Sequence, residues 1–547
     1  MYTPLNLIIL DIETLIDKNK HHILRIGVLI KNSSKLIYKM YTPSSDPQLT
    51  IDNLFNDIVK FSNNKERIFI YCHNLSKFDG PLLLQFFLNS KKIKTEKIIR
   101  THNGLIYIQV KTQNKVIVLK DSLRLIPKSL KKLSLLFSTP RKTHLPFNPR
   151  AVSKLPKSIN TYLRSDLKIV NLILRKLDFL ITKNFNLNIY SQLSLPSLGV
   201  SLLQRINPEK FLITPGEATK KFIRKSYKGG ILFCKVGRST APNLYDINSL
   251  YAFSMLNKQP IGKPRMIRSK NIDKIFGFVQ IKSIKFPSNV RFINKFRSYY
   301  FSEELKFLKT LGVEFEIKNS YQFKGSYRPF NKFSNIIYLN KEKNINIGEA
   351  IGKAILNSTY GKLGVNEPGE EDQTHEQLNN TYKMYTPLFN KNDRRFFNLK
   401  PNSNSVAIAS AISSYSRLSM LQRIFDKNLK IDYINTDSLI TTNTNTNLPL
   451  NNKIGSFKRI TPRSFKEGLY LNLKSFILSK EIIREPQMKG AKFGTIEKLE
   501  VVPRDSPQIF YEPRWNWKQV DLFTQTRKIR FGLGYNTKGS IKKGSNL

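Results

Sequence analysis

Short apolar runs and longer amphipathic stretches alternate along the first third of the chain. Short runs rich in β-branched and aromatic residues are typical of strands, and apolar positions that recur every three or four residues are typical of helices. We predict a long helix over 158–181 and a hairpin about Asn103-Gly104, a dipeptide that favours tight turns. The expected strands are Leu5–Ile12, Ile23–Ile30, Lys35–Tyr41, Arg67–Cys72 and Val116–Leu119. This alternation predicts one α/β domain over residues 1–195.

After residue 195 the pattern changes. Residues 196–240 contain three prolines and the pair Gly229-Gly230, which is typical of a connector. From residue 241 onward, strand-like and helical stretches mix without regular alternation. Within this part, residues 366–402 are polar and rich in Asn, Glu, Asp and Lys, as in an exposed excursion. The sequence therefore predicts a second region of the α+β class.

Basic residues outnumber acidic ones along the whole chain. There are 91 Lys and Arg against 39 Asp and Glu, a formal net charge of +52 at pH 7. Such a field attracts polyanions, nucleic acid first and anionic membrane second. Ribosomal and histone-like binders are usually short and poor in aromatic residues, whereas this chain of 547 residues has 36 Phe and 23 Tyr. A large basic enzyme or binding protein fits better.

The cysteines and the start of the chain bear on location. Cys72 and Cys234 are far apart and lack His at ligand spacing, so neither a disulfide framework nor a zinc site is indicated. The early apolar run Leu5–Leu10 is far too short to span a membrane, and no basic amphipathic leader precedes it. We expect no membrane partner and no cleavable presequence. Abundant Lys, Asn, Ile and Leu are typical of AT-rich genes such as those of organelles.

Acids interrupt the first apolar strand. Asp11 and Glu13 are two positions apart and therefore point to one face. Carboxylates at the end of a hydrophobic strand must be solvated, paired or bound to metal. Alone, the pair is more simply explained as a strand end at the surface.

Two further polar groups follow in order. Asn74 and Asp79 lie in a turn directly after the predicted strand Arg67–Cys72. Tyr162 and Asp166 are four apart on the long predicted helix and share a face, although a solvated helix face alone would explain them. Together, four carboxylates can cage two metal ions that activate a water and stabilise a leaving oxygen.

A second set of acids lies in the α+β region. Asp246 ends a strand-like segment that turns into a helix near Ser249, where a bound cation can meet a triphosphate. Asn435 and Asp437 lie at the tip of a predicted hairpin between residues 429–434 and 439–442.

The segment 353–361 is the most specific string in the chain. Lys353, Asn357 and Tyr360 recur at intervals of four and three, so one helical face carries a cation, an amide and a ring. Such a face suits a nucleotide, because the cation neutralises phosphates and the ring stacks under a base pair. Together with Ser358 and Gly361, these residues make five specified positions. Such a set arises by chance on the order of once per thousand chains or fewer. An ordinary surface helix is therefore a poor explanation.

In their order along the chain, these segments resemble the motifs of family B DNA polymerases. Residues 246–251, 353–361 and 433–438 resemble polymerase motifs A, B and C. The three exonuclease motifs are matched by Asp11-x-Glu13, Asn74-x3-Phe78-Asp79 and Tyr162-x3-Asp166. The resemblance extends from Asp11 to Phe476 and so covers nearly the whole chain.

For residues 1–195 the resemblance implies a ribonuclease H-like α/β exonuclease domain with a mixed sheet. Tyr162 would then orient the attacking water. The implied metal ligands and catalytic acids are Asp11, Glu13, Asp79 and Asp166. The implied contacts with the DNA strand are Asn74, Phe78, Ser122 and Leu123, although Ser-Leu alone is a common pair.

For residues 241–547 the resemblance implies an α+β right-hand polymerase domain. Asp246 and Asp437 would hold the metal ions, with two Mg²⁺ or Mn²⁺ in each active site. The implied nucleotide-binding residues are Tyr251, Lys353, Asn357 and Tyr360. The implied template and primer contacts are Tyr227, Gly229 and Gly230 of a Tyr-x-Gly-Gly element, and Lys474 of a Lys-x-Tyr-like motif.

Three positions depart from the family pattern. Ala252 replaces the Pro of motif A, which affects local rigidity more than chemistry. Phe476 replaces a Tyr and keeps the ring without its hydroxyl. Asn435 replaces the first Asp of motif C and offers a carbonyl oxygen without a charge. In the family, the acid that matches Asp437 is the one that joins the motif A acid around the metals.

The short motif spacing resembles the protein-primed subgroup, which is found in phages, adenoviruses and the linear plasmids of mitochondria. The expected parts are palm 241–257 and 403–480, fingers 343–365, thumb 481–547 and insertions 258–342 and 366–402. In that subgroup two insertions contact the priming protein and encircle DNA. The implied partners are a DNA template and primer, deoxynucleoside triphosphates and a terminal priming protein. Because Asp11 lies near the start, no terminal-protein domain is expected ahead of it.

We therefore predict a DNA-directed DNA polymerase, a nucleotidyltransferase with 3′ to 5′ proofreading exonuclease activity, in the protein-primed replication of a linear mitochondrial plasmid. An alternative is a degenerate polymerase that retains exonuclease or DNA-binding activity only, which Asn435 motivates. A purely structural basic protein would leave two ordered sets of acids unexplained.

Overall fold

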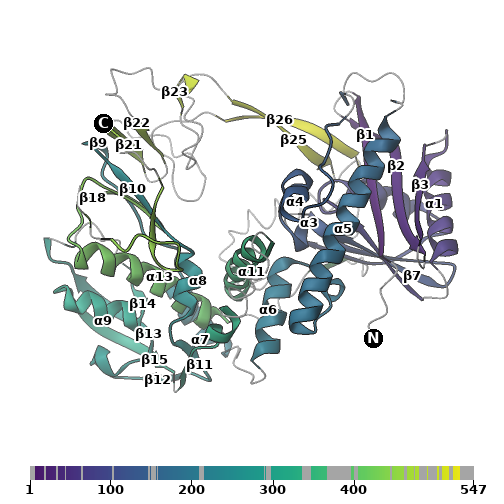
Figure 1. Cartoon of the computed structure of the whole chain (residues 1–547). Helices are drawn as coiled ribbons and strands as arrows, with labels where there is room; N and C mark the ends of the chain where they lie inside the picture. Colours follow the sequence, from purple (N-terminus) through teal and green to yellow (C-terminus); the bar gives the residue numbers. More distant parts are fainter. Residues whose placement is uncertain are drawn as a thin grey trace.

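A computed structural model gives the architecture of the chain (Figure 1). The described residues are 7–17, 20–32, 35–43, 45–62, 66–101, 104–145, 148–149, 156, 158–207, 215–288, 290, 297–323, 325–334, 347–365, 396–398, 405–443, 446, 448–460, 465–472, 475–479, 489–490, 502–503, 508–516 and 521–529. Among them, no helix combines the length and apolarity needed to cross a membrane.

A mixed sheet forms the centre of the N-terminal domain. Its first strands are β1 (Leu7–Asp17), β2 (Lys20–Asn32), β3 (Lys35–Tyr41), β4 (Arg67–Cys72), β5 (Lys94–Thr101), β6 (Gly104–Thr112) and β7 (Lys115–Asp121). β1 pairs antiparallel with β2 and parallel with β4, which runs parallel to β7. Thr101 pairs with Gly104 across the β5–β6 turn. The predicted mixed α/β sheet and its hairpin are therefore confirmed.

Helices cover both faces of this sheet. The longest are α1 (Pro47–Phe61), α2 (Asp79–Asn89) and α5 (Ile159–Phe185), with the short α3 (Ser122–Leu125), α4 (Leu130–Leu136) and η1 (Ile189–Ser191). Ile8 and Leu10 of β1 belong to the core that α1 and α2 line, whereas Leu7 and Ile9 belong to the core that α5 lines. Because successive side chains of a strand point to opposite faces, Asp11 falls on the α5 face. The predicted helix over 158–181 is confirmed as α5, which carries Tyr162 and Asp166.

Helix α6 (Leu195–Ile206) connects the two regions. It packs against α11 (Ile347–Leu363), and a Cβ added at Gly199 would lie 2.0 Å from the hydroxyl oxygen of Thr359. Only glycine therefore permits this close helix crossing. Leu198 and Leu356 belong to the same apolar core as α5, so one core extends from the N-terminal domain into the second region.

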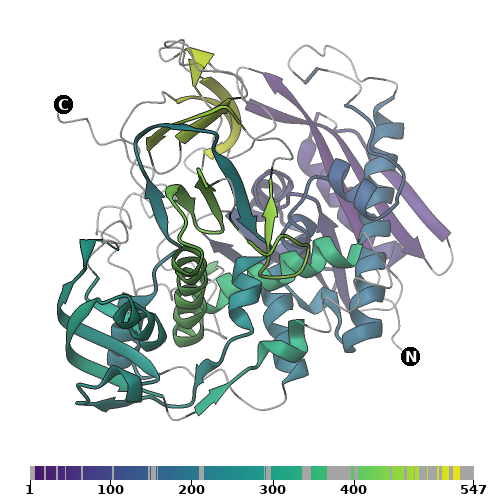
Figure 2. The ribbon, with the colours of Figure 1, turned by 60° about the vertical axis from the view of Figure 1, so that its left-hand side comes forward.

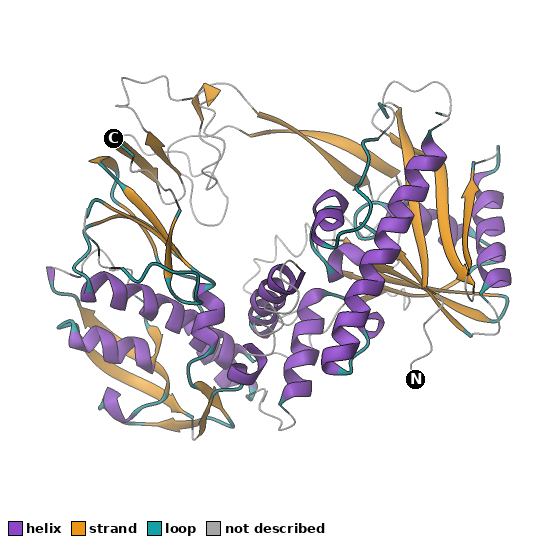
Figure 3. Ribbon diagram, in the orientation of Figure 1, coloured by secondary structure: helices purple, strands orange, loops and turns teal. Residues whose placement is uncertain are grey.

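A five-stranded sheet forms the palm. Its order is β20-β10-β19-β18-β8. The strands are β8 (Leu232–Cys234), β10 (Asn243–Ile247), β18 (Ile431–Asn435), β19 (Ser438–Thr441) and β20 (Phe457–Arg459). Helices α7 (Glu217–Ser226), α8 (Leu250–Met255) and α13 (Val406–Asp426) accompany it. Most of α13 is buried, and its many small Ser and Ala side chains allow neighbours to approach on several sides. Figure 3 shows the segregation of helices and sheets in this α+β region.

The insertion expected at 258–342 contains a sheet of its own. The order β12-β15-β13-β14 joins β12 (Arg265–Ile267), β13 (Gly277–Lys285), β14 (Tyr299–Phe301) and β15 (Glu314–Gln322), while β11 (Gln259–Ile261) pairs with β16 (Gly325–Tyr327). Its helices are α9 (Ser302–Thr310) and η2 (Ile272–Lys274). Leu421 of α13 and Leu305 of α9 share one apolar core, so the insertion is packed against the palm.

Strands from late in the chain extend the first sheet. The hairpin of β25 (Gln508–Asn516) and β26 (Asp521–Ile529) pairs with β2, and β17 (Phe396–Asn398) pairs with β5, which makes ten strands among the described residues. The hairpin runs across the top of the molecule in Figure 1, and a turned view is given in Figure 2. The other late strands are β9 (Gly237–Thr240), β21 (Glu467–Asn472), β22 (Ser475–Ser479), β23 (Lys489–Gly490) and β24 (Val502–Pro503). The sequence did not predict this extension. Every open strand edge offers the same unpaired N–H and C=O groups, so nothing in the sequence indicates which edge a late strand will pair with.

Two candidate active sites

A cavity of about 880 Å³ lies between β1, the start of α2 and α5. Eight residues predicted for the exonuclease site line it, namely Asp11, Glu13, Asn74, Phe78, Asp79, Leu123, Tyr162 and Asp166. Four segments that are separate in the sequence, the three predicted exonuclease motifs and the one that contains Leu123, thus meet in one cavity.

Ser122 is placed differently from Leu123. Its side chain is buried, and its hydroxyl donates to the carbonyl oxygen of Cys72 at 3.1 Å. The Oγ also lies 3.0 Å from Nδ1 of His73, whose Nε2 is 3.1 Å from the carbonyl oxygen of Lys128. Ser122 therefore holds the wall of the cavity together, while Leu123 faces it.

Burial makes the acids of this cavity reluctant to ionise. Burial, reinforced by the charge of Asp166, raises the pKa of Asp11 to about 7. Burial and the charge of Asp11 raise the pKa of Glu13 to about 8. The pKa of Asp79 is also well above its usual range, because its carboxyl is buried close to Asp11. A cation bound in the cavity would offset the cost of burying the ionised carboxylates and the repulsion between them, and would therefore lower their pKa values.

The donor set fits a divalent cation. Oδ1 of Asp79 and Oδ1 of Asp166 are buried and accept no hydrogen bond from any described residue. Carboxylate oxygens are the ligands that Mg²⁺ prefers. In the part of the chain that the structure describes, no group of three or more His, Cys, Asp or Glu is arranged to hold a metal ion as it stands.

Lys142 stands among these acids and was missed by sequence reasoning. Its ammonium forms an ion pair with Asp166 and donates to the hydroxyl of Tyr162 at 2.8 Å. It also lies 4.6 Å from the centre of the Tyr162 ring. The segment that contains Lys142 has no periodic pattern, and nothing local distinguishes it among 91 basic residues.

Asp121 shapes the turn that carries Asn74 and was also missed. Its buried carboxylate accepts hydrogen bonds from the backbone N–H of Asn74 at 3.1 Å, of Ser76 at 2.9 Å and of Leu123 at 2.8 Å. Asn74 has a φ of 109°, which few residues other than glycine adopt. The strands β4 and β7 are parallel neighbours, so their ends bring Asp121 and this turn together.

The two palm acids are brought together by sheet register. Asp246 of β10 lies opposite Ser438 of β19, and Asp437 is in the turn directly before that strand. The N–H of Ile247 donates to the carbonyl oxygen of Asp437 at 2.7 Å. Burial, with the charge of Asp246, raises the pKa of Asp437, while Lys353 and Lys458 oppose the rise. The hairpin predicted around Asn435 is confirmed as β18 and β19.

Three predicted tyrosines from separate segments gather beside this hairpin. The rings of Tyr251 and Tyr360 stack with centres 4.6 Å apart and planes 16° apart. Tyr227 meets the edge of Tyr360 with ring centres 6.4 Å apart. Lys353 and Asn357 are exposed on α11, the helix that carries Tyr360. These aromatic faces are suited to stacking with a nucleotide or its base pair.

The two glycines of the Tyr-x-Gly-Gly element have different surroundings. A Cβ at Gly230 would lie 2.6 Å from Cγ2 of Thr436, whereas no atom of the described residues lies within 4 Å of a Cβ at Gly229. Thr436, in the turn between β18 and β19, donates its N–H to the carbonyl oxygen of Ile231 at 2.9 Å. The missing side chain of Gly230 therefore lets the Tyr-x-Gly-Gly segment pack against the turn that contains Thr436 and Asp437. Beside Gly229 the backbone is open.

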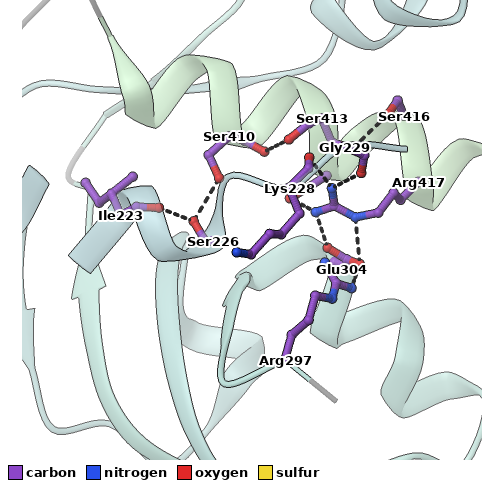
Figure 4. Close-up of polar contacts among 11 residues, drawn as sticks. Ile223, Ser226, Lys228, Gly229, Arg297, Glu304, Ser410, Ser413, Ser416 and Arg417 are labelled. Carbon is purple, nitrogen blue, oxygen red and sulfur yellow. Dashed lines mark hydrogen bonds and ion pairs between the residues drawn. The ribbon is translucent and has the colours of Figure 1, made fainter. Parts of the chain in front are cut away.

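A buried ion network fixes this segment (Figure 4). Arg417 of α13 donates from one nitrogen to the carbonyl oxygens of Lys228 and Gly229, each at 2.9 Å. It also pairs with both carboxylate oxygens of Glu304 of α9, at 3.1 and 2.8 Å, and Arg297 pairs with Glu304 from the other side. Sequence reasoning missed these residues, because charged residues distant in the chain gave no local pattern.

The primer-strand motif is only partly described. Lys474 lies outside the described residues. Phe476 packs on Tyr433, with ring centres 4.8 Å apart. Its ring thus joins the palm core near the hairpin of Asp437.

An α/β domain with an acid-lined cavity, joined to a palm sheet with two neighbouring acids, defines the class of DNA polymerases that carry an exonuclease domain. The family model for DNA polymerase type B, organellar and viral, matches residues 60–153 and 148–428. The chain belongs to this family.

Three curated relatives are described as probable DNA polymerases. The chain is 24% identical over 460 residues to a probable DNA polymerase of Podospora anserina, covering 71% of this chain and 37% of the relative. It is 26% identical over 467 residues to that of Neurospora intermedia, covering 68% of this chain and 47% of the relative. It is 24% identical over 589 residues to that of Agaricus bitorquis, covering 90% of this chain and 70% of the relative. The chain thus spans less than half the length of the first two relatives.

Solved structures share the fold. Phi29 DNA polymerase complexed with primer-template DNA superposes with a TM-score of 0.70 at 16% identity, covering 96% of this chain and all of that chain. Its ternary complex with incoming nucleotides gives a TM-score of 0.68 at 17% identity and covers 97% of this chain. The expected fold, an exonuclease domain followed by a right-hand polymerase domain, is confirmed.

Proposed function

We propose that this chain is a DNA-directed DNA polymerase with 3′ to 5′ proofreading exonuclease activity. The observation that carries the proposal is the presence of two carboxylate sites in one chain of the type B family: the cavity of Asp11, Glu13, Asp79 and Asp166, and the pair Asp246 and Asp437. A protein that only binds DNA has no need for two such sets of clustered acids.

In polymerisation, the primer 3′-hydroxyl attacks the α-phosphate of a deoxynucleoside triphosphate, and pyrophosphate leaves. Asp246 and Asp437 would hold two divalent ions, Mg²⁺ or Mn²⁺, which activate the hydroxyl and stabilise the charge on the phosphate. Lys353 neutralises the triphosphate from the exposed face of α11. The stacked Tyr251 and Tyr360 bound the sugar and the new base pair, and Tyr251 fills the space that a 2′-hydroxyl needs.

In proofreading, water attacks the phosphodiester of a frayed 3′ end. The four carboxylates of the cavity would hold the two ions that this reaction requires. Tyr162 orients the water, and Lys142 orients the Tyr162 hydroxyl through their 2.8 Å hydrogen bond. Asn74, Phe78 and Leu123 bind the unpaired strand, while Ser122 supports the wall behind them.

We further propose that a DNA template, a primer and deoxynucleoside triphosphates are the partners, and that replication starts on a terminal priming protein. The replicon would be a linear plasmid in mitochondria. The family description, organellar and viral, and the likeness to phi29 DNA polymerase support this context. The folded insertion between β11 and β16 is where the protein-primed subgroup carries an insertion of its own.

A primer-extension assay on purified protein tests the polymerase. Incorporation with magnesium or manganese is expected, and Asp437→Ala should abolish it while leaving degradation of single-stranded DNA intact. The reverse pattern is expected for Asp11→Ala combined with Asp166→Ala. If neither metal supports incorporation by the parent protein, the polymerase proposal is wrong.

Asn435 favours one second candidate, a degenerate polymerase that retains exonuclease or DNA-binding activity only. The amide keeps an oxygen donor but removes a negative charge from the hairpin of Asp437. Asn435→Asp decides between the two. A large gain in incorporation over an inactive parent, with unchanged nuclease activity, would support the degenerate enzyme.

A further inference from the structure

A lysine faces one of the two palm acids. Lys458 of β20 is the antiparallel partner of Asp246 of β10, and its Nζ lies 2.8 Å from Oδ2 of Asp246. Residues directly opposite in an antiparallel pair point to the same face of the sheet. The register of β10 and β20 therefore fixes the Cα and Cβ of Lys458 beside Asp246. The Lys458 side chain as a whole is 40% exposed.

Asp246 thus lies between two strands that bring opposite charges to it. On one side β19 brings Ser438 opposite Asp246 and, with its turn, Asp437. On the other side β20 brings the ammonium of Lys458. Asp246, which a metal ion would need as a ligand, is thus already paired with the ammonium of Lys458.

The site as a whole also carries little negative charge to attract a divalent ion. Asn435 provides an amide at the tip of the hairpin, so the carboxylates that the described part of the chain brings to this edge are Asp246 and Asp437. Lys458 cancels one of their two charges at short range. A divalent ion approaching Asp246 meets weaker attraction and must separate an ion pair before it binds.

We propose that Lys458 competes with the divalent ion for Asp246 and thereby sets the metal concentration at which the polymerase site fills. This inference rests on the proposed function of Asp246 as a metal ligand. It makes Lys458 a determinant of metal affinity rather than a catalytic residue, since the ammonium acts on the ligand and not on the reacting atoms.

Manganese binding without DNA tests the inference. The background protein carries Asp11→Ala and Asp166→Ala, which remove two acids from the exonuclease cavity, and free Mn²⁺ is measured by electron paramagnetic resonance at constant ionic strength. Lys458→Gln is expected to tighten Mn²⁺ binding roughly 10-fold, as the loss of one nearby positive charge implies. Lys458→Arg keeps the charge and should stay within about 2-fold of the background protein.

Two further variants identify the site. Asp246→Asn should abolish the effect of Lys458→Gln, because the contested ligand is gone. Lys430→Gln removes an equal charge just before β18, at the strand end remote from Asn435, and should leave Mn²⁺ binding unchanged. Circular dichroism melting curves confirm that each variant is folded.

Unchanged Mn²⁺ binding in Lys458→Gln would overturn the inference, as would equal tightening by Lys430→Gln. Weaker binding of deoxynucleoside triphosphate with unchanged Mn²⁺ binding would also overturn it and would assign Lys458 to the substrate. The proposed polymerase activity fails separately: a protein that incorporates no nucleotide but shows the expected Mn²⁺ shift keeps this inference and loses the activity.

Discussion

Arg417 and Glu304 form a two-pronged ion pair across the boundary between the palm and the insertion, with distances of 3.1 and 2.8 Å. The side chains are 5% and 1% exposed, so both charges are withdrawn from water. Arg417 uses its remaining nitrogen for the carbonyl oxygens of Lys228 and Gly229. One buried pair thus links the insertion, helix α13 and the segment that leads into the palm sheet.

Breaking this pair should destabilise the protein strongly. Glu304→Gln leaves Arg297 and Arg417 with an uncompensated buried charge, which costs about 3–5 kcal/mol. Urea denaturation followed by fluorescence measures the loss. The adjacent Glu303 pairs with Lys306 at 2.7 Å in a more exposed setting, so Glu303→Gln should cost about 1 kcal/mol or less. Equal losses in the two variants would contradict the assigned importance of burial.

The same pair predicts a pH dependence of stability. Burial alone would raise the pKa of Glu304, but Arg297 and Arg417 lower it from 4.5 to about 2. A depressed carboxyl pKa contributes stability that is present above the unfolded value and is lost as pH falls toward the folded value. The free energy of unfolding of the parent should therefore converge on that of Glu304→Gln between about pH 4.5 and 2. A constant difference over this range would contradict the assignment.

Asp121 should position the turn that carries Asn74 and the Leu123 segment, without contacting the reacting atoms. Asp121→Ala frees three backbone N–H groups of the turn and of the Leu123 segment, so we expect a roughly 10- to 100-fold slower degradation of single-stranded DNA. Primer extension should be unchanged. Asp46→Ala is the matched control, since Asp46 also accepts a hydrogen bond from the N–H two residues on, but at the start of α1. A similar loss in both variants would indicate general destabilisation.

The two glycines should separate packing from DNA contact. Gly230→Ala places a methyl group against Thr436 and should cost about 1–3 kcal/mol of stability, with a lower melting temperature in the absence of DNA. Gly229→Ala meets open space, so its melting temperature should match that of the parent while primer-template binding weakens. Unchanged binding by Gly229→Ala would remove Gly229 from the proposed DNA contacts.

The net charge predicts salt-sensitive binding. Because each neutralised phosphate releases counterions, the affinity for primer-template DNA should fall roughly 10³- to 10⁵-fold between 50 and 200 mM salt if about six to ten phosphates are contacted. Fluorescence anisotropy over this range measures the slope. A nearly flat dependence would show that the charge of +52 is not directed at DNA.

The local sequence pattern was enough to predict most helices and strands and most acids of the two candidate sites. The strands Lys35–Tyr41 and Arg67–Cys72 have the predicted bounds, and α5 covers the predicted helix. Asp11 and Asp166 were recognisable because an acid in an apolar strand, or on a helix face beside an aromatic residue, breaks a periodic pattern that depends only on neighbours in the chain.

Tertiary structure alone decided which charged groups meet. Lys142 beside Asp166, Lys458 beside Asp246, and Arg417 beside Glu304 are pairs whose members lie far apart in the chain, and 91 basic residues offer no local reason to select one. Their meeting follows from strand register, from the end positions of parallel strands and from the packing of α13 on the insertion. The sequence by itself therefore determined the kinds of element and the acids of both sites, whereas the cations that act on those acids were chosen by the fold, because register and packing are set by long-range contacts that no local pattern encodes.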